Sequence, residues 1–359
     1  MLCESGEPPL PLHRDLVMMR SATKIQASDS PTKYLFNQRD IFIINHSPPF
    51  PIRANRLIES LNENIIFPPK IELPPPWTIH RVHTCTHMYF ISKKAAYSNE
   101  QYKQLTIEHI REKGTHFAIY TDGSKSQMGV GFAAVSSSQN ILLSLPNRAS
   151  VFTAELCAIW SATKIIKGMP SQKFVIYTDS RSAIEALQNY NSKNYLVQQI
   201  KYIFHKLKET GKNIELCWVP AHVGIRGNEE ADRAAKAAIA MTKANIKIPI
   251  SDFLPTLKSF IFNKWQTLWN EEPETNKLKQ IKLEVTPWET SQQKDRYTEV
   301  VLTRLRIGHT RLTHGYLMSN PHEPIPECSQ CKSALTVEHF CPSVQFSTNN
   351  EFYVLVIIA

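Results

Sequence analysis

The central part of the sequence predicts an α/β fold with a mixed five-stranded sheet and helices on its faces. Three apolar segments joined by short polar turns at 116–146 are typical of an antiparallel meander. A continuous apolar run at 173–179 is typical of a strand covered on both faces. Segments with helical periodicity connect the later strands, and such crossovers imply parallel pairing. A proline-rich connector and a C-terminal helical region are expected to flank this α/β part.

The predicted elements run in the order βββαβααβα over residues 112–242. Strands are expected at 116–122, 129–137, 140–146, 173–179 and 214–220, and helices at 150–168, 180–188, 196–211 and 227–240. Gly168 and Gly211 mark the ends of the first and third helices, because glycine favours the conformation that terminates a helix. Ser180 and Asn228 are predicted to cap the second and fourth helices with their side chains.

The flanking regions divide by composition. Residues 1–111 are predicted to be a connector with short helices, since eight of the 23 prolines fall between Pro48 and Pro76. Residues 243–320 are expected to be helical and basic, 321–345 to be a Cys/His segment and 346–359 an irregular tail.

The overall charge and the cysteines restrict the class of protein. A formal charge of +9 favours an anionic partner, nucleic acid first and a membrane surface second. Seven scattered cysteines and the lack of a secretory segment predict an intracellular protein of the cytoplasm or nucleus, not a secreted one. No apolar run approaches the ~20 residues that span a bilayer, so no membrane partner is expected.

Two aspartates end similar strands. "IYTD" occurs at 119–122 and again at 176–179. If the two strands are parallel neighbours, Asp122 and Asp179 lie at the same edge of the sheet, where ligand sites of α/β sheets form. Each aspartate alone is also compatible with an ordinary turn residue at a strand end.

Two further acids could join this site. Glu155 lies on the apolar face of the first helix, where an unpaired carboxylate is costly to bury, and Asp232 lies in the first turn of the last helix. Four converging acids repel one another unless cations lie between them, and carboxylates suit Mg²⁺ or Mn²⁺. Two such ions about 3.5–4 Å apart suit phosphodiester hydrolysis. His222, on a glycine-containing loop, could transfer protons, although a lone loop histidine is more often a surface residue.

Four segments resemble the signature blocks of type 1 ribonuclease H. They are "YTDGS" at 120–124, "TAEL" at 153–156, "YTDS" at 177–180 and "WVPAHVGIRGNEEAD" at 218–232. Their order and the βββαβααβα pattern also match that family. The resemblance implies a ribonuclease H-like fold and an endonuclease that uses two Mg²⁺ or Mn²⁺ ions to cut the RNA strand of RNA–DNA hybrids. It implies metal ligands at Asp122, Glu155, Asp179 and Asp232, with His222 helping to activate water or release product.

The same resemblance assigns substrate contacts. It implies that Gly123, Ser124, Ser180 and Asn228 lie near the substrate. Cellular members carry amide side chains just before the helix glutamate, where they read the RNA strand, whereas this chain has Val151 and Phe152. Other elements are therefore expected to supply affinity, and the basic residues Arg304, Arg306 and Arg311 could bind phosphates or simply form a solvated helix face.

The flanks resemble non-LTR retrotransposons of the arthropod type. The similar segments are "PPFPIRANRLIESL" with "PPPWT", then "KSFIFNKWQTLWN", "RLRIGHTRLTHGYLM" and "CSQCKSALTVEHFC". This resemblance implies a C-terminal fragment of a retrotransposon polyprotein, with a reverse transcriptase region as a partner. Cys328, Cys331, His339 and Cys341 form a possible zinc set, although the single residue between the last two is short for the family.

Two alternatives remain open at this point. One is a transposase-like or integrase-like enzyme of the same fold that cuts DNA, against which the "HVGIRGNEEAD" block argues. The other is a nucleic-acid-binding remnant of a retroelement without turnover, which Val151 and Phe152 keep open.

Overall fold

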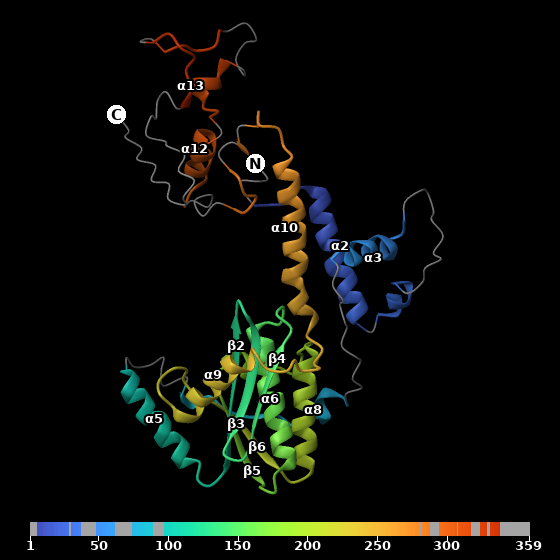
Figure 1. Ribbon diagram of the computed structural model, residues 1–359, viewed down its shortest axis with the longest axis vertical. Coiled ribbons are helices and arrows are strands. Elements are labelled where there is room, and N and C mark those ends of the chain that lie inside the picture. The colour runs from blue at the N-terminus through green and yellow to red at the C-terminus, as the bar shows by residue number, and fades with distance from the viewer. Residues whose placement is uncertain are drawn as a thin grey trace. The chain divides into compact units, whose positions relative to one another are not determined.

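The computed structural model describes residues 6–28, 30–36, 48–61, 74–88, 97–276, 278–279, 282–287, 294–306, 308–316, 324–328 and 331–337. The chain divides into two compact units. One is Arg20–Thr256, and the other combines Met1–Met19 with Leu257–Ala359. The predicted α/β part lies within the first unit (Figure 1).

One mixed sheet organises the first unit. Its strands are β1 (His83–Cys85), β2 (Phe117–Ser126), β3 (Gly129–Ser136), β4 (Asn140–Leu145), β5 (Lys173–Thr178) and β6 (Asn213–Trp218). They lie in the spatial order β1-β6-β5-β2-β3-β4. β2, β3 and β4 pair antiparallel, whereas β1, β6, β5 and β2 pair parallel. The mixed sheet and the meander are confirmed.

The five predicted strands are present as β2 to β6, and the described residues add one more strand to the sheet. The sheet has six strands, because β1 pairs in parallel with β6 and comes from the stretch interpreted as a connector. β1 has three residues, too few to show an alternating pattern, and only its pairing with a distant segment makes it a strand.

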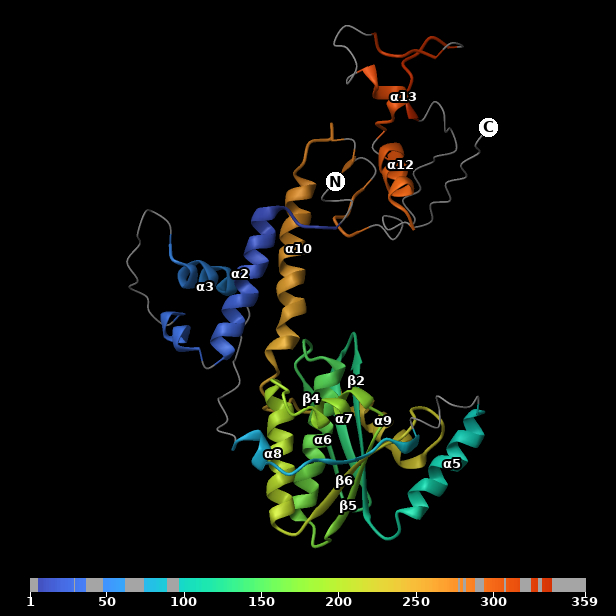
Figure 2. The same cartoon turned by 180° about the vertical axis from the view of Figure 1, so that it is seen from behind.

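Helices cover both faces of the sheet (Figures 1 and 2). They are α5 (Asn99–Glu112), α6 (Val151–Gly168), α7 (Arg181–Gln188), α8 (Tyr195–Glu209) and α9 (Arg226–Ala238). Alternate residues of β3 face opposite layers: Phe132 packs in the cluster built on α6 and α8, and Ala133 packs against α9. This explains why β3 is buried along almost its whole length and carries no polar alternation.

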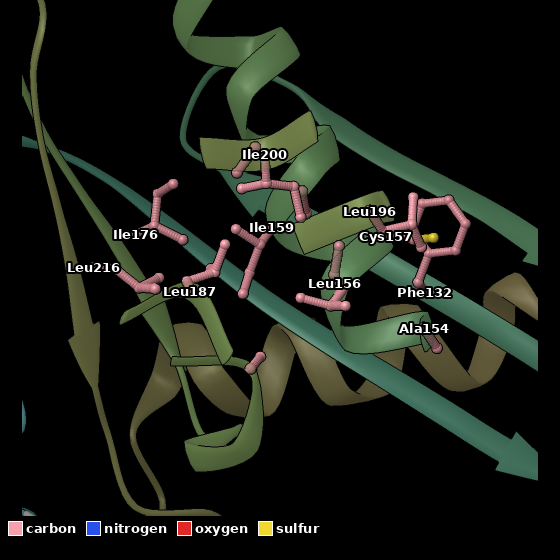
Figure 3. Close-up of a cluster of buried hydrophobic side chains, with 14 of the residues drawn as sticks. Phe132, Ala154, Leu156, Cys157, Ile159, Ile176, Leu187, Leu196, Ile200 and Leu216 are labelled. Carbon is pink, nitrogen blue, oxygen red and sulfur yellow. The ribbon is translucent and has the colours of Figure 1, made fainter. Parts of the chain in front are cut away.

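The main core lies between the sheet and helices α6, α7 and α8 (Figure 3). Phe132, Leu156, Ile159 and Ile176 are fully buried there. Each such side chain contributes on the order of 1.5–3 kcal/mol relative to exposure. This packing fixes α6 against β2 and β3, which later positions an acidic residue of α6.

The N-terminus of α6 is held by a neighbouring segment. The Ser150 hydroxyl caps the helix by accepting from the Thr153 N–H. The backbone N–H and hydroxyl of Ser150 donate to the buried carboxylate of Asp252, at 2.9 and 3.0 Å. Asp252 lies in η3 (Ile250–Phe253), so the segment after α9 also braces the start of α6.

The remaining elements are helical. They are α2 (Leu10–Ala27), η1 (Pro31–Phe36), α3 (Phe50–Glu59), η2 (Pro76–Thr78), α10 (Leu254–Asn270), α12 (Arg296–Arg306) and α13 (Arg311–His314). Among the residues described, none of these helices combines the length and the hydropathy needed to cross a membrane.

Candidate active site

The two "IYTD" segments lie side by side in register. Ile119 pairs with Ile176, Tyr120 with Tyr177 and Thr121 with Thr178 on the parallel strands β2 and β5. Asp179 follows β5 directly, as predicted. The prediction that Asp122 ends its strand is wrong, because β2 continues to Ser126 through its antiparallel pairing with β3. The parallel ladder nevertheless ends at Thr121, so both aspartates lie at the same edge.

Glu155 reaches this edge because α6 packs unusually close to β2. A Cβ atom added to Gly123 would lie 2.6 Å from the backbone nitrogen of Glu155, so only glycine allows this approach. Oxygen atoms of Asp122, Glu155 and Asp179 all lie within 4.8 Å of one another. The structure therefore brings three of the four predicted acids together.

Burial and mutual repulsion shape the electrostatics of the three acids. Burial, followed by the charges of Asp179 and Asp232, raises the pKa of Asp122 from 3.8 to about 7. Burial, followed by the two aspartates, raises the pKa of Glu155 well above its usual range. The pKa of Asp179 is raised by burial, and the Asn228 hydrogen bond and His222 oppose that rise. The three carboxylates therefore carry more negative charge than the nearby hydrogen-bond donors can stabilise.

Asn228 belongs to this site and does not cap a helix. Helix α9 begins at Arg226, and the Glu229 N–H already donates to the Ile225 carbonyl at 2.9 Å. Asn228 therefore lies in the first turn, where its side chain is buried. Its Nδ2 donates to Asp179 Oδ2 at 3.2 Å. The predicted cap is wrong because the helical ladder starts one turn earlier, which turns Asn228 toward the acids.

Asp232 belongs to a second set of ligands. Its carboxylate, an imidazole nitrogen of His222 and the carboxylate of Glu229 lie within 4.8 Å of one another. Lys236 Nζ also donates to Asp232 Oδ2 at 2.7 Å. Asp232 is still close enough to raise the pKa of Asp122. It therefore lies beside the three-acid group rather than inside it.

The loop that carries His222 is held by a residue that the sequence analysis did not select. Gly224 N–H donates to Glu229 Oε1 at 3.1 Å, which ties the loop to the start of α9. His222 itself is exposed and has a left-handed backbone, with φ of 54°. The acid-rich first turn of α9 was the only sequence signal for Glu229.

The donor set fits hard divalent cations. Glu155 Oε2 and Asn228 Oδ1 are buried oxygens without a hydrogen-bond partner among the described residues. A buried oxygen without a hydrogen-bond partner is unfavourable, so each of these two atoms is suited to coordinate a cation. Carboxylate and amide oxygens are the donors preferred by Mg²⁺ and Mn²⁺.

Residues 114–240 match the model of the ribonuclease H family. This segment is a ribonuclease H domain. The chain is also similar to ribonuclease H1 of Rattus norvegicus, Mus musculus and Homo sapiens, each 28% identical over 142 residues. Each alignment covers 34% of this chain and 50% of the relative, so the chain spans about half the length of these proteins.

The remaining predicted substrate residues of the ribonuclease H domain have defined surroundings. Ser180 caps α7 by accepting from the Ala183 N–H, which confirms the predicted cap. Ser124 is half-buried on β2 and lies opposite Gly131 of β3. Val151, at the first position of α6, is 45% exposed, whereas Phe152 packs against the main core.

The predicted residues outside the ribonuclease H domain belong to the second unit. Arg304 and Arg311 are exposed on α12 and α13, and Arg306 is the last residue of α12. Next to Cys331, the Lys332 N–H donates to the Cys328 carbonyl at 2.9 Å. The other two members of the possible zinc set, His339 and Cys341, lie outside the described residues, as does the tail 346–359.

Proposed function

We propose that the ribonuclease H domain is a metal-dependent endonuclease that hydrolyses the RNA strand of RNA–DNA hybrids. The observation that supports this most is the group formed by Asp122, Glu155 and Asp179, whose oxygens lie within 4.8 Å of one another at one sheet edge. The names of the curated relatives point to the same class of enzyme.

The site residues divide into cation ligands, a residue that positions one ligand and a residue that transfers protons. A bound divalent cation lowers the pKa of a water ligand and neutralises phosphate charge. Asp122, Glu155 and Asp179 would hold that cation, and Asn228 fixes the orientation of Asp179 through its hydrogen bond. His222 is exposed and lies beside Glu229 and Asp232, where its imidazole can accept or deliver a proton.

Substrate binding in this proposal depends on the shape of the hybrid. Proteins recognise such duplexes through phosphates and 2′-hydroxyls rather than through base sequence. Val151 offers no hydrogen bond at the exposed start of α6, and Phe152 is used in packing. The basic residues of the second unit, Arg304 and Arg311 among them, are proposed to add affinity for phosphates.

We further propose that the chain acts in retrotransposon replication inside the cell, beside a reverse transcriptase region of the same polyprotein. The support is the resemblance of the flanking segments, together with the net charge of +9. Zinc at Cys328, Cys331, His339 and Cys341 is part of this proposal, and metal analysis of residues 300–345 tests it.

A cleavage assay tests the proposed activity. We expect Mg²⁺-dependent cutting of the labelled RNA strand of an RNA–DNA hybrid, and no cutting by Asp122→Asn. Glu209→Gln, which removes one exposed carboxylate at the end of α8, is the matched control and should retain activity. Activity that survives Asp122→Asn would refute the site. Binding of the hybrid without cleavage by the intact protein would favour the remnant, and equal cutting of duplex DNA would favour the transposase-like alternative.

A further inference from the structure

Strand β1 places two cysteines opposite each other on the sheet. Its three residues pair with β6 so that Cys85 lies directly opposite Cys217. Directly opposite residues of neighbouring strands point to the same face. Cys217 is buried in the cluster that it forms with Val175, Tyr177 and Val219, and Cys85 packs against that cluster.

Helix α5 brings a histidine to the two thiols. The Nε2 atom of His109 lies 3.2 Å from Cys85 Sγ. The two sulfurs and a ring nitrogen of His109 all lie within 4.8 Å of one another. The helix is held in this position by Tyr102, whose hydroxyl donates to the Met88 carbonyl at 2.6 Å.

These separations suit a tetrahedral ion. Bonds of about 2.3 Å to sulfur and about 2.0 Å to nitrogen imply ligand-to-ligand distances of roughly 3.5–3.8 Å. The sulfur-to-nitrogen distance of 3.2 Å is only slightly shorter. A cation between these three atoms therefore needs small side-chain adjustments and no movement of the strands.

The surroundings place a carboxylate at His109 and a lysine near the thiols, whereas the hydrogen bond to Cys85 and burial raise the pKa of Cys217. The second imidazole nitrogen of His109, Nδ1, faces Glu112 Oε2 at 3.8 Å, and metal-binding histidines commonly direct their other nitrogen to a carboxylate. The hydrogen bond from the Cys217 thiol lowers the pKa of Cys85, and burial opposes that shift. Lys113 lies close enough to favour the thiolates and is itself paired with Glu215 at 2.9 Å.

We propose that Cys85, His109 and Cys217 form a second metal site, for Zn²⁺ or a similar borderline-soft cation, on the β1–β6 edge of the sheet. Two thiolates and an imidazole are the ligands that select zinc over Mg²⁺. The exposed imidazole of His87, whose ring centroid lies 5.4 Å from that of His109, lies outside the three-ligand cluster and would have to turn toward it to serve as the fourth ligand. Such a site would clip β1 and α5 to β6, and it is chemically separate from the acidic site.

Cobalt spectroscopy tests this site directly. The full chain with Cys328→Ser and Cys331→Ser removes the C-terminal cysteine pair, and the reduced, metal-free protein is titrated with Co²⁺ and then Zn²⁺. We expect thiolate-to-cobalt charge-transfer bands that correspond to one Co²⁺ ion per chain, since cobalt at the acidic site gives no such bands, and we expect Zn²⁺ to displace this cobalt. Cys85→Ser and His109→Ala should each weaken binding at least tenfold.

Controls separate this site from other effects. Cys157→Ala changes a buried cysteine of the main core and should leave the cobalt bands unchanged. Circular dichroism checks that each variant is folded, and Cys85→Ser, which is only half-buried, is the primary variant. Cys85→Ser should still cleave the hybrid with Mg²⁺, because the cysteine site is separate from the acidic site. The cobalt titration does not measure cleavage, so its result stands even if the proposed function fails. Absence of charge-transfer bands in the reduced protein, or bands that survive Cys85→Ser, would overturn the proposal, as would a Cys85–Cys217 disulfide whose reduced form binds no cobalt.

Discussion

The acidic site should lower the stability of the metal-free domain, and Asp122→Asn should reverse that effect. The raised pKa of Asp122, about 7 against 3.8, means that the folded state holds its proton more tightly than the unfolded chain between about pH 4 and 7. Stability therefore falls as pH rises through this window. A difference of about three pKa units corresponds to about 4 kcal/mol at pH 7 and above.

The side-chain amide of Asn in the Asp122→Asn variant removes the negative charge but keeps a hydrogen-bond acceptor. Its carbonyl oxygen can still accept from the Gly123 N–H, which the structure places at the carboxylate. We expect Asp122→Asn to raise the free energy of unfolding by about 2–4 kcal/mol at pH 8, since relaxation of the site reduces the upper figure. Near pH 4 the gain should vanish, because both forms of the site are then neutral at this position.

Urea denaturation in the presence of a chelator measures the effect at pH 4, 6 and 8. Addition of Mg²⁺ at pH 8 should stabilise the wild-type protein, by about 2.7 kcal/mol when the ion is at 100 times its dissociation constant. The variant should gain much less. The matched control is Asp252→Asn, because Asp252 is equally buried but accepts two hydrogen bonds from Ser150. The Asp252→Asn variant should lose about 1–3 kcal/mol of its free energy of unfolding, because the amide nitrogen would face a hydrogen-bond donor of Ser150.

A wild-type stability that does not change between pH 4 and 8 would refute the reasoning. The same conclusion follows if Asp122→Asn and Asp252→Asn shift stability in the same direction at pH 8.

Four further substitutions test separate parts of the domain. Gly123→Ala should destabilise the domain by about 1–3 kcal/mol in thermal or urea unfolding, because its Cβ would lie 2.6 Å from a backbone nitrogen of α6; an unchanged midpoint would contradict the close approach. Asn228→Ala removes the bond to Asp179 and should raise the Mg²⁺ concentration for half-maximal cleavage about 10-fold or more, while a change in KM for the hybrid alone would argue against this positioning role. Val151→Asn should lower the KM for the hybrid without changing stability, because Val151 is 45% exposed. Phe152→Gln should reduce stability, because Phe152 packs against the main core. Equal losses of stability in the two variants would contradict these roles.

The sequence patterns were sufficient for the elements of the ribonuclease H domain. Strands β2 to β6 and helices α6 to α9 follow the predicted order, because alternation, helical periodicity and terminating residues are local signals. The pairing of β2 with β5 was also predictable, since a crossover helix leaves few other arrangements.

The details of the site needed three-dimensional contacts. Asp122 lies inside a strand rather than at its end, because β3 continues to supply hydrogen bonds beyond the parallel ladder. Asn228 resembles a helix cap in the sequence, and only the earlier start of α9 turns it toward Asp179. Asp232 lies with His222 and Glu229, a division that spacing along the chain does not express.

The sequence by itself determined the order of elements and indicated the candidate acids, because both depend on residue types at local spacing. The tertiary structure decided which of these acids have oxygen atoms within 4.8 Å of one another. It also added a sixth strand to the sheet and brought Cys85, His109 and Cys217 together. The physical reason is that a three-residue strand and a long-range side-chain cluster have no periodicity. Their formation depends on packing between segments that are separated by as many as 132 positions, from Cys85 to Cys217.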